Sequence, residues 1–246
     1  MRKFADLHLK PSLEDLEQVK SMINKSAELG FQMVGLSLPS KIGVDEVNQL
    51  RKICHDAGVE LATRVDLAPK GRRELLNGLR RLRRRFEIVN VFCASKVVAR
   101  QAAKDRRVDL LSFPVAEYPK VFFDRAEAEL ASSAVACLEI DLQALLSLRG
   151  FARIRLLSVL RREVATAKSL KVPVVLSSGA TDTRFLRKPQ DMASLGMLFG
   201  LDLPLALEAL SDTPLGIVGR NRQKLSPDYV ASGVRVVRRR DCCLIE

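Results

Sequence analysis

Short apolar segments alternate with amphipathic, helix-length segments along most of this 246-residue chain. Strands that alternate with helices form parallel sheets, because each helix carries the chain back to the start of the next strand. The strands are expected at Phe4–Leu9, Met33–Leu38, Glu60–Val65, Ile88–Phe92, Val108–Phe113, Val135–Ile140 and Val174–Ser177. The sequence therefore predicts an α/β fold, a single TIM-barrel-like (β/α) barrel with about seven parallel strands.

A closed or nearly closed barrel fits the pattern better than an open sheet that binds nucleotides. Open nucleotide-binding sheets usually have a glycine-rich first turn, whereas residues 9–12 here read LKPS. No glycine- or serine-rich linker marks a domain boundary. We expect one barrel domain over residues 1–225, with extra C-terminal helices, and a basic tail over residues 226–246.

The charge of the chain indicates a polyanionic partner. Lys and Arg total 41 against 29 Asp and Glu, a formal net charge of +12, and the basic residues are clustered. Nucleic acid is the commonest partner of such a protein. Trp is absent and aromatic residues make up only 5% of the chain, so stacking of bases on an aromatic sheet is poorly supplied. We therefore expect RNA to be bound mainly through its phosphates.

Arginine fills five of the six positions from 80 to 85, on a segment whose leucines predict a helix. Like charges four residues apart repel, so such a run favours an external polyanion. A second cluster precedes a predicted helix start at Pro189, and backbone N–H groups at a helix start favour phosphate. Small residues at 177–180 offer backbone N–H groups as well. The RNA-binding candidates are Arg64, Arg80, Arg81, Arg84, Ser178, Arg184, Arg187 and Lys188.

Polar residues at the predicted strand ends mark the mouth of the barrel, where chemistry occurs in this fold. Asp6 and His8 are two apart on one strand and are expected to face the same side. With Glu139 and Asp141 they offer ligands for a single Mg²⁺ at most, because the chain has only two histidines, His8 and His55. We favour a polar network without a metal, and we predict no catalytic residue and no bound cofactor.

The number of cysteines and the hydropathy of the chain indicate where in the cell the protein is expected. The five cysteines are odd in number and form no CxxC pair, which is typical of a reducing cytoplasm. No apolar run reaches the roughly 18 residues that a membrane span needs. We expect a cytoplasmic protein without a membrane partner.

Two segments resemble the signature of a known family: residues 177–180 (SSGA) and 186–201 (LRKPQDMASLGMLFGL). Weaker likenesses are residues 4–9 (FADLHL), 63–64 (TR), 109–112 (DLLS) and 139–141 (EID). The family is ribonuclease P protein component 3, the archaeal and eukaryotic subunit with a TIM-barrel-like fold.

The resemblance implies a protein subunit of the endoribonuclease that removes 5′ leaders from precursor tRNA. In this family the RNA subunit carries the catalytic site with its own Mg²⁺, and the protein pairs with a small ferredoxin-like subunit. One alternative is a metal-dependent phosphoesterase on a related polymerase-and-histidinol-phosphatase-like barrel, against which the shortage of histidine argues. Another is a small-molecule barrel enzyme, against which the lack of a strand-end lysine argues.

Overall fold

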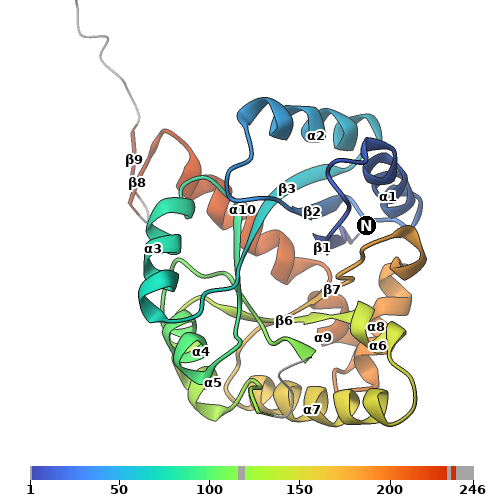
Figure 1. The fold of residues 1–246 in the computed structure, drawn as a ribbon, viewed down its shortest axis with the longest axis vertical. Helices are drawn as coiled ribbons and strands as arrows, with labels where there is room; N and C mark the ends of the chain where they lie inside the picture. The colour runs from blue at the N-terminus through green and yellow to red at the C-terminus, as the bar shows by residue number, and fades with distance from the viewer. Residues whose placement is uncertain (1, 116–119, 232–233, 237–246) are drawn as a thin grey trace, which may run out of the picture.

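The computed structural model describes residues 2–115, 120–231 and 234–236. Seven parallel strands stand side by side in chain order and curve into a barrel (Figure 1). They are β1 (Ala5–Leu9), β2 (Met33–Ser37), β3 (Glu60–Leu67), β4 (Ile88–Phe92), β5 (Leu110–Ser112), β6 (Cys137–Asp141) and β7 (Val174–Ser177). The predicted TIM-barrel-like fold is confirmed.

The barrel is nearly closed between its first and last strands. Leu9 at the end of β1 forms a parallel bridge with Ala180, three residues beyond β7. The backbone N–H of Lys10 donates to the Ala180 carbonyl at 2.8 Å. Seven strands therefore surround one interior.

Amphipathic helices cover the outside of the barrel (Figure 1). They are α1 (Leu16–Glu28), α2 (Val44–Asp56), α3 (Arg72–Leu82), α4 (Lys96–Ala103), α5 (Arg125–Ser132), α6 (Leu142–Ser147), α7 (Gly150–Ser169), α8 (Pro189–Met197), α9 (Leu203–Glu208) and α10 (Asp212–Leu225). Their buried side chains are mostly apolar and pack against the strands or against neighbouring helices. In α3, for example, Leu75, Leu79 and Leu82 are buried. None of the helices in the described residues is long and apolar enough to cross a membrane.

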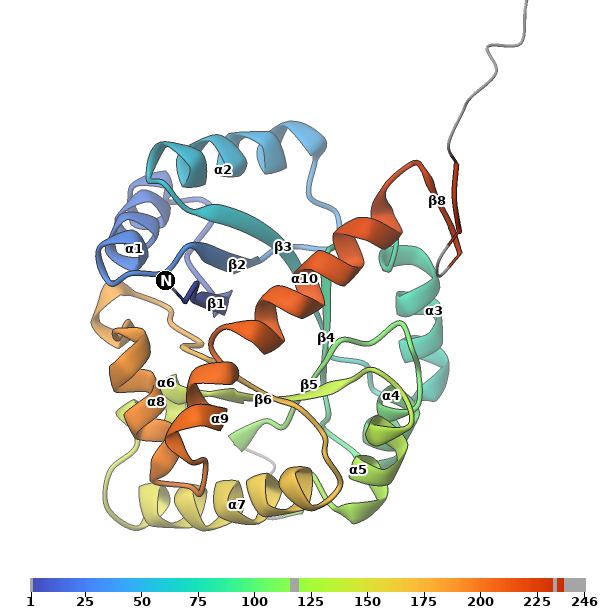
Figure 2. The ribbon, with the colours of Figure 1, turned by 180° about the vertical axis from the view of Figure 1, so that it is seen from behind.

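The last helix, α10, lies across the N-terminal end of the barrel (Figure 2). Its buried Ile217 and Val218 cover a layer of small and aliphatic side chains inside the barrel. That layer is formed by Ala5, Leu7, Met33, Ala62, Ile88, Leu110, Cys137 and Val175. The barrel is thus a packed core at this end and not an open pore.

Hydrogen bonds and ion pairs fasten α10 to the strands. The Asn221 side chain donates to Asp109 at 2.8 Å, and Arg220 approaches the same carboxylate at 3.1 Å. Arg222 donates to Glu87 at 2.7 Å, next to the start of β4. Because these acids precede β4 and β5, the helix is held to the barrel on its polar side as well as its apolar side.

The first strand contains a bulge that shapes the barrel interior. Asp6 pairs with Val34 and Leu9 with Leu36, so Leu7 and His8 both stand opposite the single residue Gly35. A Cβ on Gly35 would lie 2.8 Å from the Leu7 Cα and would overlap its carbonyl group. Glycine is therefore required for the close approach of the two backbones.

Part of the expected basic tail is described. After α10, the strands β8 (Tyr229–Ala231) and β9 (Val234–Arg235) form a small antiparallel hairpin. The rest of the tail, residues 237–246 with its three consecutive arginines, lies outside the described residues.

We predict that Gly35→Ala destabilises the protein by about 1–3 kcal/mol, because a methyl group is forced into a packed backbone contact. The measurement is the free energy of unfolding by denaturant. A matched control is Gly78→Ala in α3, where the new Cβ meets only the Leu67 side chain at 3.5 Å. That change should leave stability equal or raise it by about 0.5–1 kcal/mol, since alanine favours helix over glycine. Equal effects of the two substitutions would contradict the role assigned to the bulge.

Candidate functional site

A buried guanidinium occupies the centre of the barrel mouth. Arg64, on β3, has no exposed surface. Its two terminal nitrogens donate to the two carboxylate oxygens of Glu139 on β6, at 2.5 and 2.6 Å. Its Nε donates to Asp66 at 2.9 Å, and one terminal nitrogen also donates to the Leu7 carbonyl of the bulge at 3.0 Å. The side chain therefore connects β1, β3 and β6 through the interior.

Neutral polar groups from the other strands complete the hydrogen bonding of the two carboxylates. Ser112 and Ser177 each donate to Glu139 at 2.8 Å. Asn90 donates to Asp66 at 2.7 Å, and the Ser37 hydroxyl also bonds to Asp66. Asn90 was not expected at this site. Its only sequence signal is a polar residue at an inward-facing position of an otherwise apolar strand.

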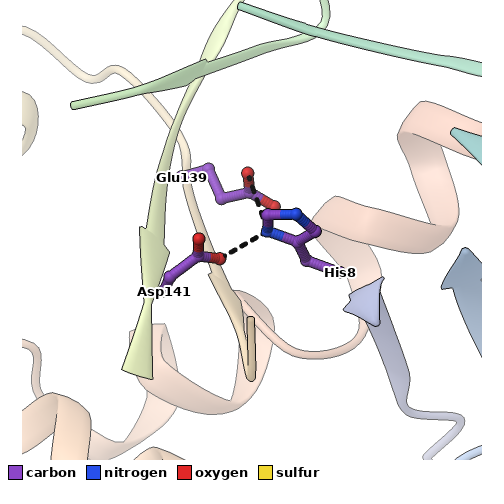
Figure 3. A group of neighbouring side chains, drawn as sticks. All are labelled: His8, Glu139 and Asp141. Atoms are coloured by element: carbon purple, nitrogen blue, oxygen red, sulfur yellow. Dashed lines mark hydrogen bonds and ion pairs between the residues drawn. The ribbon is translucent and has the colours of Figure 1, made fainter. Parts of the chain in front are cut away.

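His8 joins this network from the bulge in β1 (Figure 3). Its Nδ1 lies 2.7 Å from Asp141, and its Nε2 lies 3.5 Å from Asp66. Burial and the nearby Arg64 lower the pKa of His8, but the carboxylates of Asp141 and Asp66 outweigh them and raise it to about 9. His8 is consequently an imidazolium at neutral pH.

The pKa values of Asp66 and Asp141 shift in the opposite direction and are lowered. Burial alone would raise the pKa of Asp66, but Arg64 and His8 hold it well below its ordinary value. Burial likewise opposes ionisation of Asp141, and the charge and hydrogen bond of His8 lower its pKa. Lys10 lies 3.8 Å from Asp141 at the rim. Three cations, Arg64, His8 and Lys10, thus face the three carboxylates of Asp66, Glu139 and Asp141.

This arrangement fits a metal ion poorly. His8, Glu139 and Asp141 have ligand atoms within 4.8 Å of one another, so their spacing alone is compatible with a cation. Both oxygens of Glu139 are already engaged by Arg64, and each also accepts from a serine. A divalent ion would have to displace Arg64 or lie beside it, at a large electrostatic cost. These side chains therefore form an internal network of ion pairs and hydrogen bonds.

Asp6 does not belong to this network, contrary to the expectation that it faces the same side as His8. The bulge breaks the strand alternation between the two residues. The Asp6 carboxylate instead accepts from the backbone N–H of Ser178 at 3.0 Å and of His8 at 3.2 Å. Burial raises the pKa of Asp6 despite these hydrogen bonds. Asp6 therefore bridges the seam between β1 and the end of β7.

Two of the RNA-binding candidates are core residues. Arg64 is buried as described, and Ser178 is 2% exposed, with its hydroxyl donating to the His8 carbonyl at 3.3 Å. Their burial removes both from the set of surface groups. Sequence reasoning missed this because a strand-end arginine looks the same whether its partner is RNA or a carboxylate on another strand.

The remaining candidates lie at the surface in two places. Arg80 and Arg81 are exposed on α3, and Arg84 is exposed just beyond it. Arg184, Arg187 and Lys188 lie on the segment between β7 and α8, which leaves the mouth of the barrel. Arg184 is exposed and forms an ion pair with Asp182 at 3.0 Å, and Lys188 is the exposed N-cap of α8. Arg187 is half-buried and donates to two backbone carbonyls at 2.7 Å, so it also stabilises its own loop.

Comparisons with known proteins agree with this architecture. The family model described as RNase P subunit p30 matches residues 3–226. Ribonuclease P protein component 3 of Methanosarcina acetivorans is 32% identical over 190 residues, covering 75% of this chain and 76% of that protein. The protein of the same name from Methanococcoides burtonii is 28% identical over 236 residues, covering 96% of this chain and 94% of that protein.

Solved structures share the barrel. A chain in the cryo-EM structure of archaeal Ribonuclease P with mature tRNA has a TM-score of 0.79 at 20% identity, covering 94% of this chain and 98% of that chain. A putative prolidase from Bifidobacterium longum has a TM-score of 0.56 at 10% identity, with 90% and 70% covered. At these identities the likeness shows the fold. The family match and the sequence relatives together show that this chain belongs to the RNase P subunit p30 family.

Proposed function

We propose that this chain is a non-catalytic protein subunit of ribonuclease P, the endoribonuclease that removes 5′ leaders from precursor tRNA. The observation that carries the proposal is the barrel mouth, where an arginine and a histidine neutralise the carboxylates that a hydrolytic site would use for metals. Hydrolysis of a phosphodiester by a protein usually needs metal ions that activate water and stabilise charge. Here Arg64 and the two serines already engage Glu139.

The catalytic site and its Mg²⁺ are accordingly assigned to the RNA subunit, and no cofactor or metal is assigned to this chain. The partners proposed are the RNA subunit and other protein subunits of the enzyme, among them a small ferredoxin-like protein. Family membership supports the protein partners, and the net charge of +12 supports the RNA partner. The related archaeal assembly was solved with mature tRNA.

The surface proposed to meet RNA consists of Arg80, Arg81 and Arg84 together with Arg184, Arg187 and Lys188. All six are arginine or lysine, whose cationic side chains bind phosphate oxygens. A cytoplasmic location is proposed as well. It is supported by Cys54, Cys93 and Cys137, which are buried as free thiols.

We predict that the isolated chain does not cleave precursor tRNA, with or without Mg²⁺. Cleavage should require the RNA subunit and should increase when this chain and the other protein subunits are added. The measurement is the release of 5′ leader from labelled precursor tRNA. Asp141→Asn, which removes one of the possible metal ligands, should alter cleavage by the reconstituted enzyme only modestly when the variant is folded. RNA-independent cleavage that Asp141→Asn abolishes would instead establish the metal-dependent phosphoesterase.

A second prediction concerns the pH dependence of stability. The pKa of His8 rises from 6.5 to about 9 on folding, so its contribution is fully present below pH 6.5 and is lost as the pH rises through 9. A shift of this size corresponds to roughly 3 kcal/mol. The free energy of unfolding, measured by denaturant titration at several pH values, should therefore fall over this range.

The control for the pH prediction is His8→Gln, which keeps a polar side chain but cannot titrate. Its free energy of unfolding should be lower than that of the wild type at pH 6, and the two proteins should converge towards pH 9 and above. A difference that stays constant across this range would show that His8 is not an imidazolium in the folded protein.

A further inference from the structure

A basic groove lies at the N-terminal rim of the barrel, on the opposite side from the ion network. The end of α3, the turn between α4 and β5, and the chain that follows α10 meet there, with the β8–β9 hairpin beside them (Figure 2). The groove encloses about 520 Å³. None of its lining residues was among the RNA-binding candidates except Arg84.

The lining of the groove is strongly cationic. Arg83, Arg84, Arg106, Arg107 and Lys224 line it, and no lining residue is acidic. The other lining residues are Leu225, Ser226, Tyr229 and Val230. The cations come from three separate parts of the chain, so the cluster is a product of the fold and not of one charged run.

The cations divide into two groups. Arg83 and Arg107 are held by carboxylates: Arg83 forms an ion pair with Asp109, and Arg107 donates to Asp105 at 2.7 and 2.8 Å. The side chains of Arg84, Arg106 and Lys224 are exposed and form no hydrogen bond or ion pair within the described residues. The first group builds the wall, and the second group is available to a ligand.

The lowered pKa of Lys224 reflects both partial burial and the excess of positive charge around the groove. Partial burial and the neighbouring guanidiniums of Arg220 and Arg83 lower the pKa of Lys224, although Asp109 opposes them. Mutual repulsion among these cations means that an anion placed in the groove is stabilised by several of them at once.

We propose that this groove binds the phosphodiester backbone of RNA. The inference rests on the proposed function and adds a site to it. Arg84 lies four residues from Arg80, so on the helical path of α3 and the turn that follows it the groove continues the exposed basic face of the helix. The cations of the groove come from the end of α3, the α4–β5 turn and Lys224, so a single RNA strand in the groove would place its phosphates among cations from all three. Guanidiniums bind phosphate through paired hydrogen bonds.

The test compares two triple variants with equal charge loss. The groove variant carries Arg84→Ala, Arg106→Ala and Lys224→Ala. The control carries Lys41→Ala, Arg51→Ala and Lys52→Ala, which are exposed positions on α2 and the loop before it. Binding of the full-length chain to the RNA subunit of ribonuclease P is measured by fluorescence anisotropy at several salt concentrations, with thermal midpoints recorded for both variants.

The groove variant should bind more weakly than the control, and the slope of log K against log salt should become shallower by about 2 to 3, because three phosphate contacts are lost. The control should retain the wild-type slope to within about one unit. Equal slopes in the two variants would show that the groove does not bind RNA phosphates, and the proposed function would still stand. The groove is also overturned as an RNA site if its variant keeps its RNA affinity but loses binding to another protein subunit, which would identify an acidic protein as the occupant. A wild-type chain that does not bind this RNA at low salt would overturn both proposals.

Discussion

The guanidinium of Arg64 is the interaction on which the interior of the barrel depends. Removing one partner of such a buried pair leaves an uncompensated charge and costs about 3–5 kcal/mol, whereas an apolar replacement of both partners is often neutral. The pair therefore determines geometry more than stability. Arg64 joins β3 to Glu139 on β6 and to the Leu7 carbonyl on β1, and the carboxylates that it orders collect the polar groups of the remaining strands.

The opposite, N-terminal end of the barrel is closed by a helix. There α10 covers an apolar layer, and the buried carboxylate of Asp109 accepts from Asn221, Arg220 and Arg83. The chain thus fills the N-terminal end of the barrel, and at the mouth it leaves a cavity of about 380 Å³ beside Ser112, Glu139 and Asp141. The outer surface of the barrel carries the excess positive charge and is available for binding.

The fold was predictable because alternation of apolar and amphipathic segments is a local property, and each predicted strand corresponds to an observed one. The site was predictable only in part. His8, Glu139 and Asp141 do converge, but the partner of Arg64 lies 75 residues away along the chain. The bulge that separates Asp6 from His8 lies on β1, and its one sequence signal, the glycine inside the strand at Gly35, lies on the neighbouring strand β2. The arginine run is divided in a way that sequence could not show, since Arg83 binds Asp109 and Arg85 donates to the carbonyls of Ser40 and Ile42.

Separation of the charges explains how one small barrel can carry a net charge of +12 and still fold. At the mouth, three cations and three carboxylates cancel, so the interior contributes little to the external field. On α3, burial of Leu75, Leu79 and Leu82 contributes about 1.5–3 kcal/mol per side chain, which exceeds the few tenths of a kcal/mol that each pair of like charges costs on the exposed face. The helix can therefore hold its arginines in place without a partner, and in the RNA-binding role proposed for them a bound phosphate would relieve their repulsion without disturbing the packing beneath.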